Sequence, residues 1–103
     1  MADPMRIRAQ AQGNNAVVRV LMSHEMETGQ RKDGAGKVIP AWHITHVTAA
    51  LNGKQVMSAE WGPAVAKNPF LQFTLKGAKA GDKVAVTWKD NKGETRTDEV
   101  TVS

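Results

Sequence analysis

The strongest constraint on the fold is an alternation of apolar and polar side chains at a period of two residues. In the segment 83–89, Val84, Val86 and Trp88 share one side, while small or polar residues share the other. Successive side chains of a β-strand point to opposite faces, so this pattern predicts a strand with one buried face. Similar patterns mark six further candidate strands, at residues 5–11, 16–22, 41–51, 54–61, 70–76 and 99–102.

Turn signals separate these candidate strands. Asn52-Gly53 joins two of them directly, and this pair favours a two-residue hairpin turn because both residues tolerate a positive φ. About seven strands with turns between them are typical of an immunoglobulin-like sandwich of two sheets. We therefore expect an all-β fold, in one domain that spans residues 1–103. Between Pro63 and Pro69 we expect either one helical turn or a loop that crosses between the sheets.

Composition excludes several classes of protein. No apolar stretch approaches the ~18 residues that span a bilayer, so a membrane protein is excluded. The formal net charge is +4, but basic residues are spread along the chain and the clustered aromatic residues of RNA-binding modules are absent. Nucleic-acid binding is therefore disfavoured. The chain has no cysteine, which excludes disulfides, thiolate ligands and a thiol nucleophile.

The first residues bear on location. The sequence MADPMRIRAQAQG lacks the apolar core and the small-residue cleavage site of a secretory signal. By itself this start predicts that the chain stays in the cytoplasm. The absence of cysteine is compatible with either a reducing or an oxidising compartment.

Residues 23–44 carry more chemistry than a turn requires, so we consider a metal site there first. His43 and His46 are three residues apart, and in a strand they would point to opposite faces and could not share one ion. His24 lies near two carboxylates but lacks an evident third strong ligand. We therefore expect no metal and no cofactor.

Catalysis by this segment is also disfavoured. Ser23 and His24 are neighbours, and neighbours on an extended chain point apart, so they are poorly placed to hydrogen-bond. Glu25 and Glu27 would share a face, but paired surface glutamates are common in proteins without catalytic activity. The run GAGK lacks the features of a phosphate-binding loop. We expect that the chain is not an enzyme.

A binding role for the same segment is plausible. Met26 is an apolar residue among charged ones, a combination typical of a contact surface. Arg31 can offer a bidentate fork to a carboxylate or an oxyanion. The residues that follow, Asp33 to Gly36, have ordinary turn chemistry.

At these residues the sequence resembles the SoxZ family. The resemblance rests on the block SHEMETGQRKD at 23–33, on Val38-Ile39-Pro40 and on Leu51-Asn52-Gly53. Asn68-Pro69 and the motif of Trp88, Asp90 and Gly93 complete it. The likeness runs from about residue 16 to the C-terminus, and the first dozen residues match loosely.

The resemblance implies an immunoglobulin-like sandwich that pairs with a second subunit, SoxY, in a carrier of sulfur intermediates for thiosulfate oxidation. In that family SoxY bears the reactive cysteine on a flexible arm that visits the pathway enzymes. A second thiol beside that arm would invite disulfide exchange, so the absence of cysteine here is expected. The resemblance also implies a periplasmic location, because SoxY carries the export signal and the pair crosses together.

The candidate contact residues follow from both lines of reasoning. The block 24–31 with Lys32 is expected to meet a pathway enzyme or the carrier arm of SoxY, or to form the permanent SoxY interface. Large apolar residues are candidates for that permanent interface, although Trp42 could equally complete the core. The candidates are His24, Glu25, Met26, Glu27, Gln30, Arg31, Lys32, Trp42, Trp61 and Phe70.

A rival hypothesis is a stand-alone β-sandwich that binds an oxyanion or another small ligand. In that case His24 and Arg31 would be the ligand contacts.

Overall fold

A computed structural model describes residues 3–62, 65 and 67–103. It contains seven β-strands and, within the described residues, no helix. The strands are β1 (Arg6–Gln12), β2 (Asn15–Leu21), β3 (Ile44–Leu51), β4 (Lys54–Glu60), β5 (Phe70–Lys76), β6 (Lys83–Asp90) and β7 (Thr95–Thr101). The predicted all-β fold is confirmed, and every predicted strand is present with ends shifted by a few residues.

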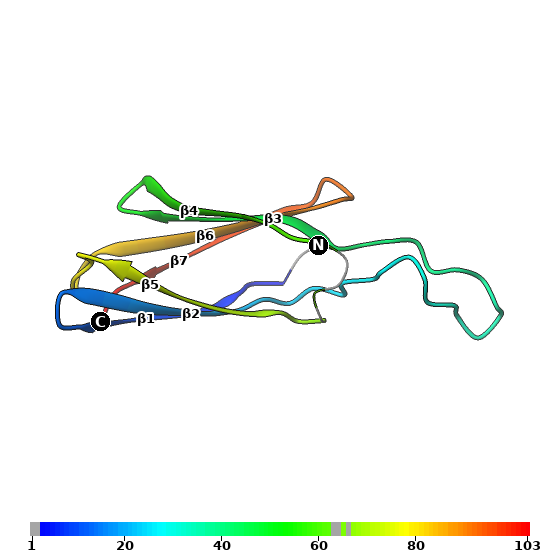
Figure 1. Ribbon diagram of the computed structural model, residues 1–103, viewed down its shortest axis with the longest axis horizontal. Helices are drawn as coiled ribbons and strands as arrows, with labels where there is room; N and C mark the ends of the chain where they lie inside the picture. Colours follow the sequence, from blue (N-terminus) through cyan, green and yellow to red (C-terminus); the bar gives the residue numbers. More distant parts are fainter. Residues whose placement is uncertain (1–2, 63–64, 66) are drawn as a thin grey trace.

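The strands form two antiparallel sheets packed face to face (Figure 1). One sheet has the order β1-β2-β5, and the other has the order β4-β3-β6-β7. The hairpin between β3 and β4 turns at Asn52 and Gly53, whose φ angles of 51° and 85° are those that the sequence predicts for this pair. The chain crosses between the sheets after β2, after β4 and after β5.

The core consists of the inward positions of the predicted alternation. Val84, Val86 and Trp88 of β6 are buried against Val18 and Val20 of the opposite sheet. Each large side chain removed from water contributes about 1.5–3 kcal/mol of transfer free energy. Replacing Trp88 by alanine should therefore cost about 3–5 kcal/mol.

The two long sides of the sandwich differ. On one side β1 lies against β7, and the C-terminus closes the seam through two hydrogen bonds, Ala11 N–H to Ser103 O (2.9 Å) and Ser103 N–H to Ala9 O (3.0 Å). On the other side no comparable contact joins the edge strands β4 and β5 across the sheets, as far as the described residues show. We call the latter the open side.

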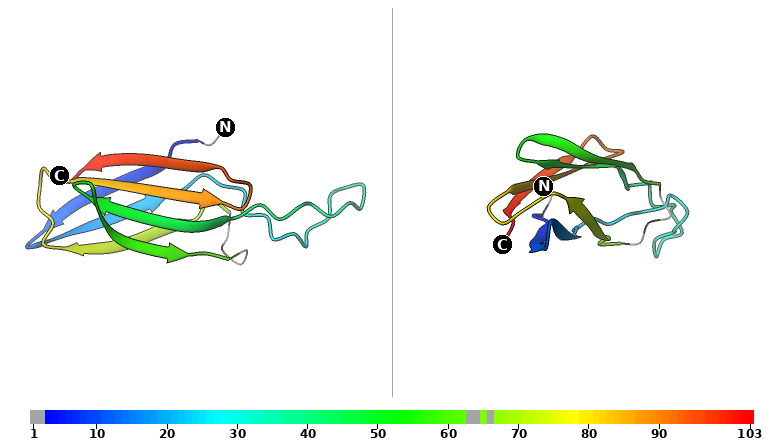
Figure 2. Two further views of the ribbon diagram at one scale, coloured as in Figure 1. Left: turned by 90° about the horizontal axis from the view of Figure 1, so that it is seen from above. Right: turned by 60° about the vertical axis from the view of Figure 1, so that its left-hand side comes forward.

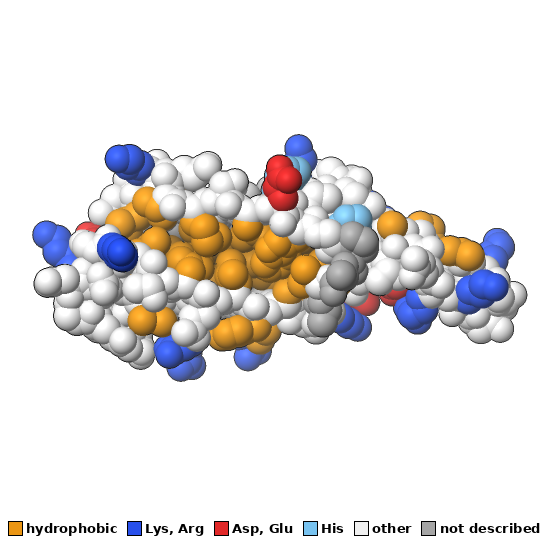
Figure 3. Space-filling model, in the orientation of Figure 1, with side chains coloured by type: hydrophobic (Ala, Val, Ile, Leu, Met, Phe, Trp, Pro, Cys, Tyr) orange, Lys and Arg blue, Asp and Glu red, His pale blue; other side chains and the backbone are white. Residues whose placement is uncertain are grey.

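Inward-facing side chains of the edge strands line the open side. They pack against the core but stay partly exposed: Met57 from β4, Trp61 just after it, and Leu71 and Phe73 from β5. Figure 3 shows the resulting band of hydrophobic side chains between the two sheets. Phe73 is thus an inward residue on an incompletely covered side.

Two further expectations from the sequence concern membrane-spanning helices and the segment between Pro63 and Pro69. Among the described residues, no helix has the length and hydropathy needed to cross a bilayer. The expected turn or crossing between Pro63 and Pro69 falls partly outside the described residues, at positions 63, 64 and 66.

Candidate functional site

The connection between β2 and β3, residues 22–43, forms an arm that projects past the end of the sandwich (Figures 1 and 2). Its two limbs are bridged near the sandwich by Glu27 and Trp42, which exchange backbone hydrogen bonds of 2.6 and 3.0 Å. A second bridge links Lys32 to Val38 further out. We call residues 24–27 and 41–43 the root of the arm, and residues 31–39 its tip.

The root is fixed by a buried pair from opposite sheets. His24 follows β2 and Asp90 ends β6, and both side chains are almost completely buried. The imidazole Nε2 lies 3.1 Å from Asp90 Oδ2, and the Trp42 indole N–H donates to the same oxygen at 2.8 Å. One carboxylate therefore ties together both limbs of the arm and the end of β6.

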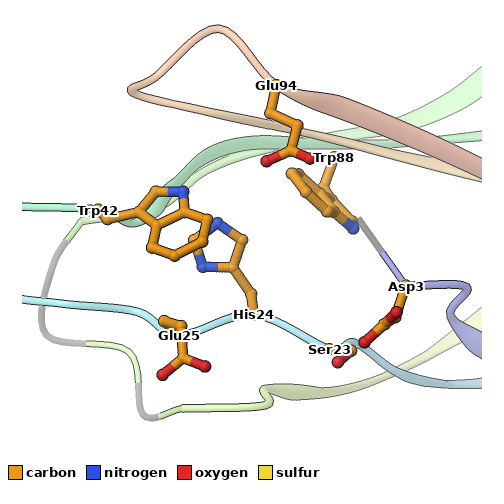
Figure 4. Close-up of a pocket in the computed structure, with 7 residues that line it drawn as sticks. All are labelled: Asp3, Ser23, His24, Glu25, Trp42, Trp88 and Glu94. Carbon is orange, nitrogen blue, oxygen red and sulfur yellow. The ribbon is translucent and has the colours of Figure 1, made fainter. Parts of the chain in front are cut away.

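The hydrogen bonds of His24 define its tautomer. Its Nδ1 accepts the backbone N–H of Met26 at 3.0 Å, so the ring proton is on Nε2, which donates to Asp90. Trp42 and Trp88 contact the ring edge to face, with centroids 5.2 and 5.1 Å away. Figure 4 shows His24 between the two indoles. Because both ring nitrogens are occupied within the chain, His24 is not placed to act as a general base or as a ligand contact.

Asp90 is held in its ionised form. Its Oδ1 accepts the backbone N–H groups of Lys92 and Glu94 at 3.0 and 2.9 Å. Burial raises the pKa of this carboxyl, but the hydrogen bonds from Trp42, His24 and these two backbone groups outweigh burial and hold the pKa below its ordinary value. The negative charge is thus stabilised by four donors, two from the arm and two from the turn between β6 and β7.

Met26 is not the exposed anchor that the sequence predicted. Its side chain is buried in the core with 5% exposure, and its sulfur accepts the backbone N–H of Ile44 at 3.3 Å. The residue has a positive φ of 51°, which turns the side chain inward at the root. His24 is likewise buried, so these two candidates are not available to a partner in this conformation.

The charged candidates lie outside the cluster. Glu25 is exposed and pairs with Lys67 at 3.2 Å. The carboxylate of Glu27 accepts two hydrogen bonds from the Arg31 guanidinium, at 3.1 and 2.5 Å. That contact lowers the pKa of Glu27. Glu25 and Glu27 therefore do not form a carboxylate pair, and the fork of Arg31 is engaged within the chain rather than open to an oxyanion.

The remaining candidates are all partly or fully exposed. Gln30 and Lys32 lie exposed on the arm. Trp42 is half-buried in the root, where Lys92 Nζ lies 4.2 Å above its ring, and Trp61 lines the open side. Phe70 is 60% exposed on the outer face of β5, beside Leu21. The structure therefore separates the candidates into a buried root, an exposed arm and two apolar positions on the sandwich.

A cleft of about 220 Å³ lies beside the buried pair (Figure 4). It is lined by Asp3, Ser23, His24, Glu25, Trp42, Trp88 and Glu94. Three carboxylates at its walls disfavour an anionic ligand. The side chain of Glu25 points away from the imidazole, and Ser23 has no hydrogen bond to His24. The arrangement provides no activated nucleophile.

A metal centre finds no support in the described part of the chain, which contains no group of three or more suitable side chains. His43 is half-buried just before β3, and His46 is exposed on a strand whose register shifts between Ile44 and His46. The two histidines are not brought together.

Sequence reasoning used Asp90 as a motif residue but missed its role in the root. A signal was present: the inward alternation of Val18, Val20 and Met22 continues through His24 and Met26, beyond the end of β2. Asp90 continues the inward row of Val84, Val86 and Trp88 in the same way. Polar residues at inward positions indicate a buried pair, but the partners themselves lie 66 residues apart in sequence.

Together the fold and the site define a small β-sandwich with one open apolar side and an arm whose root is fixed by a buried cluster. A family model described as sulphur oxidation protein SoxZ matches residues 5–101. The chain belongs to the SoxZ family and so to a sulfur-oxidation system. The match includes β1, which the sequence resemblance had left out. No curated protein matches the chain.

Proposed function

We propose that the chain is the non-catalytic subunit of a sulfur-carrier heterodimer and pairs with SoxY through its open side. Family membership supports the role in sulfur oxidation. The observation that carries the pairing is the incomplete closure of the sandwich between β4 and β5. Partly exposed Met57, Trp61, Leu71 and Phe73 would gain burial from a partner at this side.

The edge strands β4 and β5 give a second reason to expect a partner at the open side. β4 and β5 are each hydrogen-bonded to one neighbour, so one edge of each strand is unpaired within its sheet. Unpaired edges beside apolar side chains invite association with another chain. A stable interface covers roughly 800 Å² on each partner. β4 and β5 contribute seven residues each to the open side.

In this proposal the reactive thiol belongs to SoxY. The chain has no cysteine, and both nitrogens of its buried histidine are engaged internally. The subunit therefore supplies a surface and not a reacting group. We also propose that the pair acts in the periplasm, to which SoxY carries it by co-export.

The rival hypothesis, a stand-alone oxyanion-binding module, loses its two contact residues. His24 is buried and Arg31 is engaged by Glu27. Calorimetry of the isolated chain with sulfite, sulfate and thiosulfate tests it directly, and we expect no heat of binding. Turnover by the isolated chain would support an enzyme instead.

The pairing is tested by the double variant Trp61→Ala, Phe73→Ala. Buried aromatic side chains dominate interface energies, so we expect affinity for SoxY to fall at least about 100-fold. The matched control is Leu21→Ala with Val38→Ala, which truncates exposed apolar residues on β2 and on the arm and should leave the affinity unchanged. Unchanged affinity of the folded double variant, confirmed by its circular dichroism, would refute pairing through the open side.

A further inference from the structure

The two sheets carry very different charge. The three-stranded sheet contains Arg6, Arg8, Arg19 and Lys76 and no acidic residue at all. The four-stranded sheet is balanced, with Lys54, Lys83, Lys89 and Arg96 against Glu60, Asp90, Asp98 and Glu99. The four cations of the first sheet equal the formal net charge of the chain, +4, so the remaining residues carry no net charge.

All four cations lie on the outer face of their sheet. The inner face is formed by the alternate positions, among them Ala9, Val18 and Leu75, which are buried. Arg6, Arg8 and Lys76 are exposed, and Arg19 is half-buried. We call the outward surface of β1, β2 and β5 the basic face.

The strand register places two of these charges directly opposite each other. Arg8 is the cross-strand partner of Arg19, and like charges in that position destabilise a sheet. Arg19 Nε donates to the neutral Gln72 at 3.3 Å. Among the described residues, none of the four cations forms a salt bridge. The isolated chain therefore maintains an uncompensated repulsion on a regular sheet.

Exposed apolar side chains adjoin the charges. Arg6, Leu21 and Phe70 lie in one row across the three strands, and Leu21 and Phe70 are 40% and 60% exposed. Phe70 is the most exposed large hydrophobic residue that the described structure shows. Two exposed apolar residues beside unpaired arginines combine the features of an interface anchor and a charged rim.

We propose that the basic face docks an acidic protein surface, so that carboxylates of the partner lie opposite Arg8 and Arg19 and an apolar patch covers Phe70. The inference builds on the proposed function: the partner is a protein of the sulfur-oxidation system that the carrier pair visits. Complementary charge mainly speeds encounter and selects partners, as a shuttling carrier requires. The open side remains with SoxY, so both contacts can form together.

A protein suits this face better than a nucleic acid. The charges stand on the outer face of the sheet, and Phe70 is the one aromatic residue on that face, because Phe73 points inward. The basic face therefore lacks a platform on which successive bases could stack. The arginine forks match carboxylates bidentately, and the row of Leu21 and Phe70 favours an apolar counterpart.

The test uses the heterodimer with SoxY and the purified enzymes of the system as probes, one at a time, in biolayer interferometry. The variant Arg8→Gln, Arg19→Gln should weaken binding to at least one enzyme roughly tenfold at low salt. That difference should shrink in about 0.5 M salt, where exposed charges are screened. The control Lys83→Gln, Lys89→Gln removes the same charge from β6 of the other sheet, away from the open side, and should leave binding unchanged.

The possible results separate this inference from the proposed function. Loss of enzyme binding with intact SoxY pairing supports the basic face. If pairing with SoxY is intact and the arginine variant binds the enzymes as tightly as the control does, docking at the basic face is refuted while the proposed function stands. Failure of the unmodified chain to pair with SoxY refutes the proposed function. Binding of DNA or anionic vesicles at the basic face, with no enzyme bound there, also overturns the inference. Removing the arginine pair should not lower the melting temperature, because it relieves a repulsion.

Discussion

The turns at Asp33–Lys37 and Asp90–Glu94 have the same local structure and opposite surroundings. In each, one carboxylate oxygen of the first residue accepts the backbone N–H groups two and four residues later, at 2.9–3.0 Å. In each, the fourth residue is a glycine with φ 81°. The first turn is exposed at the tip of the arm, whereas the second has its aspartate buried at the root.

The difference lies in the second carboxylate oxygen. Asp90 Oδ2 accepts hydrogen bonds from His24 and Trp42, which belong to the two limbs of the arm. No described donor contacts the second oxygen of Asp33. The Asp33 turn therefore binds only nearby backbone, whereas the Asp90 turn also joins both limbs of the arm to the end of β6. The root of the arm is therefore tied to the sandwich, whereas the hydrogen bonds of the Asp33 turn stay within the arm.

The largest effect is expected for Asp90→Ala. The change leaves His24 Nε2–H, Trp42 Nε1–H and two backbone donors without their acceptor in a buried site, so we expect a loss of about 3–5 kcal/mol of stability. Urea unfolding of the isolated chain measures it. Asp90→Asn, which keeps an acceptor oxygen, should lose less. If Asp90→Ala were as stable as the parent, Asp90 would not be the residue that joins the arm to β6.

The second largest effect is expected from acid, which should lower the free energy of unfolding by protonating Asp90. The pKa of Asp90 in the folded chain lies below its ordinary value of 3.8. A depressed folded pKa contributes stability that is full above the unfolded pKa and is lost as pH falls through the folded one. The parent should therefore lose stability relative to Asp90→Asn from about pH 4 downward. If the stability of the two proteins changed in parallel between about pH 6 and about pH 2, the assignment would be contradicted.

At the tip, Asp33→Ala should cost far less. The variant loses two exposed hydrogen bonds to the backbone, whose donors water can satisfy, so we expect about 0.5–1 kcal/mol. Urea unfolding under the same conditions gives the matched value. A loss equal to that of Asp90→Ala would show that the tip is as tightly integrated as the root.

The smallest effect is expected for Arg31→Ala. In its ion pair with Glu27 the arginine side chain is 63% exposed, and solvent screening leaves exposed pairs of this kind little net contribution to stability. The melting temperature should fall by about one or two degrees at most. A larger shift would mean that the outer part of the arm is stabilised by this pair.

The sequence predicted the parts of the fold that depend on local periodicity. The inward row of Val84, Val86 and Trp88 and the turn at Asn52-Gly53 follow from strand geometry and from backbone preference, and both are confirmed. The SoxZ resemblance is also confirmed, by the match over residues 5–101. Neither local pattern predicts which sheet a strand joins. The open side between β4 and β5 depends on the strand order and could not be predicted from the sequence.

The site was harder to predict because its contacts are tertiary. Met26 and His24 stand among charged residues, and composition alone placed them on a surface. Their burial depends on Asp90 and Ile44, which come from the opposite sheet. The basic face is visible in the sequence as strands without acidic residues, but the opposition of Arg8 and Arg19 requires the register. The partner roles of the exposed candidates stay predictions.

Hydrogen exchange with and without SoxY tests the pairing through the open side most directly. Unpaired amides on the outer edges of β4 (residues 54–60) and β5 (residues 70–76) should become protected when SoxY is added, while the seam between β1 and β7 should exchange as before. Protection confined to β1 and β7, or none at saturating SoxY, would contradict the account.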